Sequence, residues 1–288
     1  MGKSEFGTFN FTEVGLNFSK QLNSDLRVGL QLFTSNTGTT GNFNSKLDWA
    51  VADYRYSDEL GFRFGRVKIP FGLYNDSIDV DSARVPILLP QSVYPEQNRN
   101  YLLSQNGGEI YGYKYGLEYR FYTGTIYADK NNNPGNTYQI TDINIPYLFG
   151  GRLMWFTPID GLKLGGTIQV LRIDESITNT TGTVKISAKI PAVLWIASME
   201  YHKRDFLLAS EYSQWRLRIK DSTNTTLVPN QKVTNERAYI MATNHFHDLI
   251  QPALYYSVYF PDINNHTGGR EKYQQDLALS FRFDINSF

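Results

Sequence analysis

The chain contains no cysteine, and this absence excludes several classes of protein at once. Without thiols there is no disulfide framework, no cysteine nucleophile and no cysteine-based metal site. Net charge is also absent, because 28 basic residues balance 28 acidic ones, so no overall field attracts nucleic acid. No run of about 18 apolar residues occurs, which excludes a transmembrane helix. Membrane-spanning strands remain open, since their alternating pattern dilutes hydropathy.

Several sequence motifs are missing as well. The residues from Met1 to Gly7 lack the apolar core of a signal peptide, so we expect a processed or truncated chain, or one that stays in the cytoplasm. The sequence has no glycine-rich phosphate loop, nucleophile elbow or zinc-protease helix. We therefore predict no catalytic residue, no metal site and no cofactor.

Alternation with a period of two residues runs through most of the chain, and helical periodicity is almost absent. Leu26, Val28, Leu30 and Leu32, for example, alternate with polar residues or glycine. Several segments, such as 162–173, reach ten residues or more, which suffices for a tilted membrane strand. In a membrane barrel the apolar faces contact lipid and the polar faces line water, whereas in a β-sandwich the apolar faces pack on each other.

The connections between these segments alternate between short and long, as in outer-membrane barrels, which have short turns at one rim and long loops at the other. Aromatic residues near the strand ends, including Trp155, Trp195, Tyr201, Trp215 and Tyr255-Tyr256, are expected to form girdles at the two membrane interfaces. The predicted short connections are 20–25, 57–59, 122–124, 157–161, 202–205 and 245–250, and the long ones are 34–45, 70–108, 129–146, 174–182, 221–236 and 261–272.

These patterns predict an all-β fold, a transmembrane antiparallel up-and-down β-barrel that forms a single domain over residues 1–288. About thirteen strand segments are visible, and the first and the last both run from the long-loop rim to the short-turn rim. Bacterial barrels use even strand numbers. We therefore expect about 14 strands, or 16 if two have been merged, with the first strand and a signal peptide missing from this chain.

The long connection 70–108 is expected to fold into the barrel as a constriction, because it is too rich in Leu, Ile, Val, Pro and Tyr to be disordered. An acidic loop opposite a basic wall would give a transverse field with weak anion preference. Alternatively, the same charges pair with one another to hold the loop down. The predicted constriction residues are Arg66, Lys68, Asp79, Asp81, Arg84, Glu96 and Arg99, with Asp76 beside them; the predicted lumen wall carries Arg27, Lys114, Glu118, Arg120, Arg152, Arg216 and Arg218, with Glu211 and Lys220.

The strand before this loop contains an irregularity at Gly65. Phe62 and Phe64 share the parity of Arg66 and Lys68, which would place two cations in hydrocarbon. A bulge at Gly65 would send the two cations into the lumen and turn Val67 and Ile69 outward. In the alternative, both cations extend to the outer rim.

Two motifs in this region resemble a family of Gram-negative outer-membrane porin-like proteins, loosely related to the phosphate-selective and general porins. They are the stretches 60–75 (LGFRFGRVKIPFGLYN) and 88–95 (LLPQSVYP), and Trp49 lies upstream of both. The resemblance, specific over residues 45–115, implies a diffusion channel, often trimeric, with an inward-folded loop. Loop 70–108 contains no lysine, which argues against the lysine-dependent phosphate selectivity of some relatives.

The end of the chain also fits this resemblance. Apolar residues two apart, from Leu277 to Ile285, precede a terminal Phe288, which lies out of phase with them. Such an end implies recognition by the barrel-assembly machinery. The other expected partners are the lipid bilayer, lipopolysaccharide and small hydrophilic solutes, with a homotrimer as a candidate assembly and no nucleic acid.

The leading prediction is thus a porin of the bacterial outer membrane, without enzyme activity. Two alternatives stay open: a substrate-gated transporter or barrel enzyme with the loop as its lid, and a soluble carbohydrate-binding β protein.

Overall fold

The computed structural model describes residues 11–37, 43–80, 84–96, 99–128, 138–179, 181, 185–221, 230–246, 249–266 and 273–284. Thirteen strands form one sheet in which each strand pairs with the next along the chain. The strands are β1 (Phe11–Gln21), β2 (Leu26–Thr37), β3 (Lys46–Arg55), β4 (Gly61–Lys68), β5 (Ser104–Lys114), β6 (Leu117–Ile126), β7 (Tyr138–Phe156), β8 (Leu162–Asn179), β9 (Lys185–Lys203), β10 (Phe206–Asp221), β11 (Gln231–Asn244), β12 (Ile250–Phe260) and β13 (Gln274–Phe283).

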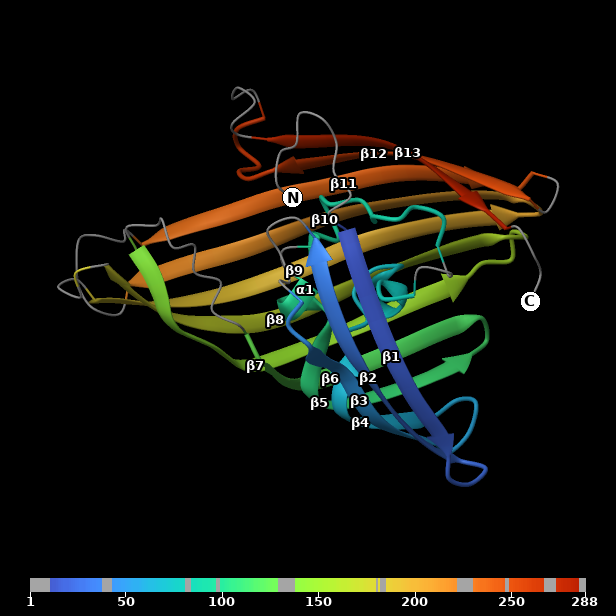
Figure 1. The fold of residues 1–288 in the computed structure, drawn as a ribbon, viewed down its shortest axis with the longest axis horizontal. Helices are drawn as coiled ribbons and strands as arrows, with labels where there is room; N and C mark the ends of the chain where they lie inside the picture. The colour runs from blue at the N-terminus through green and yellow to red at the C-terminus, as the bar shows by residue number, and fades with distance from the viewer. Residues whose placement is uncertain are drawn as a thin grey trace.

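Every neighbouring pair is antiparallel, and the sheet curls around a central space (Figure 1). The predicted all-β, up-and-down architecture is confirmed. β1 and β13 form the two edges and run in the same direction, and the described residues show no hydrogen-bonded pairing between them. The additional strand therefore stays a prediction. Within the described ranges, no helix is long and apolar enough to span a membrane.

The outer face of the sheet is apolar, as the alternation predicts. In β13 the exposed side chains are Leu277, Leu279, Phe281 and Phe283, each with more than half of its surface accessible. Contiguous apolar surface of this kind is unfavourable in water and matches the lipid-facing band of a membrane barrel. Ile285 and Phe288, which complete the predicted end of this strand, lie outside the described residues.

One predicted strand is in fact a hairpin. Alternation through residues 110–121 predicts a single strand with a turn at 122–124, but the chain reverses at Tyr115-Gly116, between β5 and β6. Both turn residues have positive φ, 52° and 79°, the signature of the two-residue turn that suits the twist of a hairpin. Because so short a turn leaves the apolar alternation uninterrupted, the sequence pattern does not reveal it.

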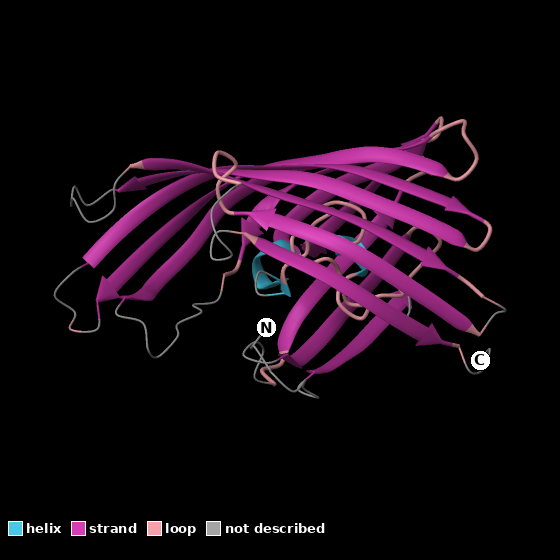
Figure 2. Cartoon of the chain, turned by 90° about the horizontal axis from the view of Figure 1, so that it is seen from above, coloured by secondary structure: helices cyan, strands magenta, loops and turns pink. Residues whose placement is uncertain are grey.

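A loop between β4 and β5, residues 69–103, enters the sheet from one rim and packs against its inner face. We refer to it as the inner loop; residues 81–83 and 97–98 of it lie outside the described residues. It contains the one-turn helices η1 (Asn75–Ser77) and α1 (Arg99–Leu102), which lie within the curve of the sheet (Figure 2). The predicted loop extended to residue 108, but β5 begins at Ser104.

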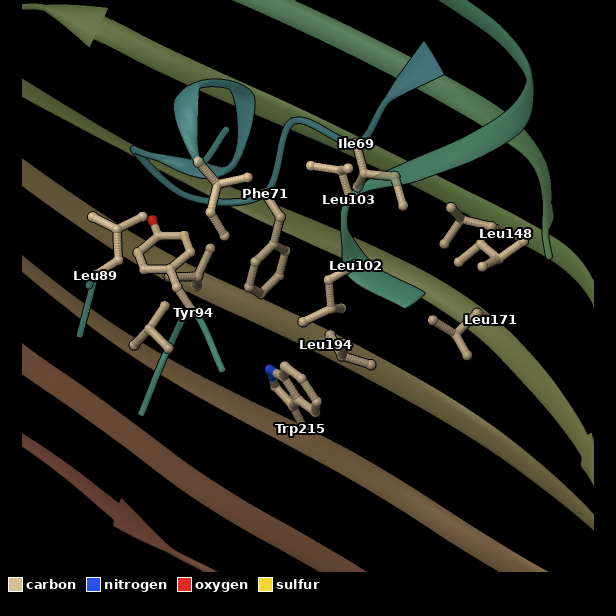
Figure 3. Close-up of a cluster of buried hydrophobic side chains, with 14 of the residues drawn as sticks. Ile69, Phe71, Leu89, Tyr94, Leu102, Leu103, Leu148, Leu171, Leu194 and Trp215 are labelled. Carbon is tan, nitrogen blue, oxygen red and sulfur yellow. The ribbon is translucent and has the colours of Figure 1, made fainter. Parts of the chain in front are cut away.

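The inner loop and the wall share a hydrophobic core. Phe71 of the loop is 1% exposed and meets Trp215 of β10 edge to face, with ring centroids 6.5 Å apart (Figure 3). Leu194 and Ile196 of β9 belong to the same cluster. The inner face of β7–β12 is therefore apolar where the loop packs, not uniformly polar as expected for a water-filled barrel. Trp215 and Tyr255, which we expected in the interfacial girdles, point into this core.

Candidate functional site

A cavity of about 900 Å³ lies between the inner loop and the inner face of the first half of the sheet. Most of the hydrophobic core lies on the other half of the sheet, so the wall of this cavity is polar. Seven basic and five acidic side chains line it, together with Trp49 and Tyr111. The charged lining residues are Asp25, Arg27, Asp53, Arg55, Asp58, Arg63, Arg66, Lys68, Asp76, Glu118, Arg120 and Arg152.

Eight charged side chains form a continuous row along this wall, with the signs alternating at every step. We call this row the charge ladder. It crosses from β2 through β6 on adjacent strands, then passes through Asp76 of the inner loop to β7 and returns to β6. The N–O distances are 3.4 Å for Arg27–Asp53, 3.1 Å for Asp53–Arg63, 2.8 Å for Arg63–Glu109, 2.7 Å for Glu109–Arg120, 2.5 Å for Arg120–Asp76, 2.9 Å for Asp76–Arg152 and 2.5 Å for Arg152–Glu118.

Asp76 is the member of the ladder that joins the loop to the wall. It lies on η1, which Asn75 fixes by donating its side-chain amide to the carbonyls of Ile69 (2.7 Å) and Leu102 (2.8 Å). Burial opposes ionisation of Asp76, but the guanidinium groups of Arg120 and Arg152 outweigh it and hold the pKa of that carboxyl below its ordinary value. Asp76 is therefore a carboxylate under neutral conditions, bridging two strands to the loop.

A second anchor of the inner loop is the buried carboxylate of Glu211 on β10, which is 2% exposed. It accepts hydrogen bonds from the Leu73 amide (2.9 Å) and the Tyr94 hydroxyl of the loop, and from Ser198 (2.5 Å) and Tyr239 (2.8 Å) of the wall. Burial and the adjacent Glu211 carboxylate raise the pKa of Tyr94 well above its ordinary value. The Tyr94 phenol thus remains a donor to Glu211 through neutral and mildly alkaline pH.

Two ion pairs hold the inner loop to the opposite wall. Lys68 at the end of β4 contacts Asp79 at 2.5 Å, and the Asp79 side chain is fully buried. Arg99 donates to both oxygens of Asp48 on β3, at 3.0 and 2.6 Å. A paired guanidinium and carboxylate of this geometry is the strongest of the ordinary side-chain contacts. These charges hold the loop in place, in line with the second of the two interpretations given above.

The structure corrects the expectation for Gly65. No register shift occurs on either side of it, but its φ of +118° lies outside the β region and is open only to glycine. Strict alternation ends there. Arg66 and Lys68 line the cavity as expected, but Val67 lines it too, and Ile69 is buried in the core under the loop. Val67 and Ile69 therefore do not face outward.

The other predicted site residues lie in different parts of the structure. Arg27, Glu118, Arg120 and Arg152 lie on the cavity wall. Arg84 is 9% exposed and binds loop carbonyls, including that of Pro86 at 2.6 Å, and the Glu96 amide donates to the Gln91 side chain at 3.1 Å. Lys114 lies at the end of β5 and pairs with Glu59 of a short turn at 3.1 Å, so it is at the rim rather than on the lumen wall. Asp81 lies outside the described residues.

Arg216 and Arg218 do not face the lumen. The inward positions of β10 are Glu211, Ser213 and Trp215, so the even-numbered residues point outward, and both arginines are exposed. The 16 residues of β10 span about 50 Å at about 3.3 Å each. Even when tilted, such a strand exceeds a hydrocarbon layer of about 30 Å. Its outward polar end therefore lies beyond the apolar band, where cations carry no desolvation cost.

Three residues of the charge ladder were not predicted from the sequence: Asp53, Arg63 and Glu109. The inward position of Arg63 could have been predicted, because it lies between Phe62 and Phe64, which face outward, and neighbouring residues of a strand take opposite faces. Asp53 likewise shares the inward parity of Trp49 and Val51 on β3. Glu109 was hidden, because it lies between the predicted loop 70–108 and the predicted strand that begins at residue 110, whereas the structure places it inside β5.

The fold and the cavity define a class of architecture: an up-and-down antiparallel sheet with a polar cavity on its inner face and a loop packed inside is the arrangement of the outer-membrane porins. No protein-family model matches the chain, and no curated protein matches it in sequence.

Solved structures show the likeness in fold. An anion-selective porin from Comamonas acidovorans aligns with a TM-score of 0.55 at 13% identity, over 94% of this chain and 73% of that one. A loop-deletion mutant of OmpT, an outer membrane protein of Vibrio cholerae, aligns at 0.50 and 11% identity, over 94% and 89%. OmpF of Salmonella typhi, solved in complex with daunomycin, aligns at 0.50 and 17% identity, over 90% and 74%. At these identities the likeness concerns the fold alone.

Proposed function

We propose that the chain is an outer-membrane porin that lets small hydrophilic solutes and ions diffuse passively past the inner loop. The observation that carries this proposal is the charge ladder, which lines a cavity of about 900 Å³ inside a porin-type sheet. Selectivity in such channels depends on pore radius and lining charge. The ladder offers both signs to a passing solute, and the inner loop forms the constriction.

A weak anion preference is part of the proposal. Of the charged residues that line the cavity, seven are basic and five are acidic, a difference of two positive charges. The four acids of the ladder are each bound by arginine, so pairing largely cancels the field and the remaining preference is small. We place the protein in the bacterial outer membrane, with lipid and lipopolysaccharide around it, a trimer as its candidate assembly and the barrel-assembly machinery acting on its terminal strand.

Planar-bilayer recording in a salt gradient tests the proposal. The wild-type protein is expected to give steady single-channel conductance and a reversal potential displaced modestly toward that of the anion. The double variant Arg120→Gln/Arg152→Gln should move it toward the cation, because Asp76 and Glu118 lose their arginine partners and Glu109 keeps only Arg63. Arg218→Gln is the matched control, since Arg218 lies on the outer face.

Each part of the proposal has its own contrary result. Cation selectivity of the wild-type protein would refute the anion preference. Current that appears only in the presence of one solute would favour a substrate-gated transporter instead. A chain that stays monodisperse without detergent is no porin.

A further inference from the structure

A second, smaller cavity of about 220 Å³ lies between the inner loop and the short-turn ends of β9 to β13. It shares no lining residue with the larger cavity. We propose that it is a binding site for a small oxyanion, a phosphate or a short carboxylate. Binding at this site does not depend on whether the protein conducts ions.

The lining of this cavity is predominantly cationic. It includes Arg84, Arg204 and Arg282 together with His202 and His245, against one lining acid, Asp205. Arg282 also contacts Asp284, at 2.8 Å. A guanidinium group presents paired N–H donors in the geometry that carboxylate and phosphate oxygens accept.

Arg84 supplies a preformed cationic wall. Its guanidinium is fixed by the carbonyls of Pro86 (2.6 Å) and Ile78 (3.2 Å), so the side chain is held in place at the cavity by the inner loop itself. The side chain is about nine-tenths buried. Because these carbonyls already accept from its donors, Arg84 offers a ligand a fixed positive charge at the cavity wall.

His245, at the β11–β12 turn, supplies an unsatisfied polar atom. Its Nε2 is buried and has no hydrogen-bond partner in the described structure. A buried polar atom without a partner destabilises the folded state, and native proteins rarely retain one without a water, ion or ligand. An oxyanion in the cavity would accept a hydrogen bond from this nitrogen.

Arg204 lies in the two-residue turn between β9 and β10, where its φ is +54°. Residues other than glycine seldom adopt this conformation, and such positions cluster at ligand sites, where the surrounding structure enforces them. No hydrogen bond or ion pair of the Arg204 side chain is found among the described residues. Its charge is thus available to a ligand in the cavity.

The size of the cavity limits the ligand. A volume of 220 Å³ holds several waters but falls below the range of about 300–1,000 Å³ typical of drug-sized ligands. Inorganic phosphate, or a dicarboxylate of three or four carbons, satisfies both the volume and the charge. Nucleotides and oligosaccharides exceed the volume.

Calorimetric titration of the detergent-solubilised full chain tests the site with two probes, inorganic phosphate and malonate, and with glycerol as the uncharged reference. The wild-type protein should bind at least one anion and not glycerol. Arg204→Gln and His245→Gln should each weaken binding about tenfold or more, as expected for a lost hydrogen bond to a charged group. Phosphate alone would assign a phosphate site, and malonate alone a carboxylate site.

Lys203→Gln provides the matched control. Lys203 is the neighbour of Arg204 and carries the same charge, but it pairs with Asp160 at 3.6 Å and does not line the cavity. Its variant should bind as the wild type does. The proposal is overturned if the wild type binds neither anion, or if Lys203→Gln weakens binding as much as Arg204→Gln. Because binding is measured without a membrane potential, either result leaves the channel proposal to its own test.

Discussion

Replacing Glu211 with alanine tests whether one buried carboxylate holds the inner loop against the wall. The substitution leaves four donors without their acceptor: the Leu73 amide and the hydroxyls of Tyr94, Ser198 and Tyr239. Two of these donors, the Leu73 amide and the Tyr94 hydroxyl, belong to the loop, so at about 1 kcal/mol net for each hydrogen bond the loop loses about 2 kcal/mol of docking energy. Since about 1.4 kcal/mol is a factor of ten, local opening of the loop should become roughly thirtyfold more frequent.

Glutamine at the same position is the matched control. Its carbonyl oxygen can accept from Leu73 and Ser198, and its amide can donate to the two tyrosine hydroxyls, which accept as well as donate. Glu211→Gln should therefore keep the loop closed. Hydrogen exchange reports local opening directly, and the amides of Ser77 and Tyr94, which bond to carbonyls within the loop, are suitable probes. Equal exchange in the alanine and glutamine variants would show that Glu211 is not an anchor.

Three further predictions concern Asp76, Phe71 and Gly65. The contribution of Asp76 to loop docking should be complete above pH 3.8, the ordinary pKa of an aspartate, and should be lost as the pH falls through the lowered pKa of Asp76 in the fold. Asp76→Asn should remove this acid transition from the hydrogen exchange of the loop. The same variant should also move the reversal potential measured at neutral pH further toward that of the anion. Phe71→Ala should cost about 3–5 kcal/mol of loop packing and speed loop exchange while the amides of β8 stay protected. Gly65→Ala should lower the refolded fraction on unheated gels, because its Cβ would meet the Ala50 carbonyl at 2.4 Å, whereas Gly15→Ala, with nothing closer than 3.7 Å, should refold normally.

The strands could be predicted from the sequence because alternation is a local property. It identifies β2, β8 and β13 without knowledge of their neighbours. Which side chains face inward is harder to predict, because a single tight turn exchanges the inward and outward positions of the residues that follow it. The hairpin at Tyr115-Gly116 puts Tyr113 on the cavity wall and Phe121 on the outer face, although both belong to one unbroken alternation.

The sequence of β9 indicates a hydrophobic core on the inner face of the sheet, but it does not show which segment covers that face. In β9 both faces are apolar, with Leu194 and Ile196 on one and Val193 and Trp195 on the other, a pattern typical of a strand covered on both sides. What covers the inner face depends on the path of a loop more than a hundred residues away in the chain. The same holds for the ladder: Arg120 and Arg152 could be predicted to face the lumen, but their shared partner Asp76 depends on that path.

The anchors of the inner loop impose an order on folding. The Leu73 amide reaches across 138 positions of sequence to Glu211, and Ser92 reaches across 146 to the carbonyl of Ala238. Contacts between such distant residues form only after the loop-closure entropy between them has been met. The contacts of the loop with β10 and β11 therefore form only after those two strands have joined the sheet. Until then Phe71 of the loop lacks the Trp215 ring that covers it in the folded chain.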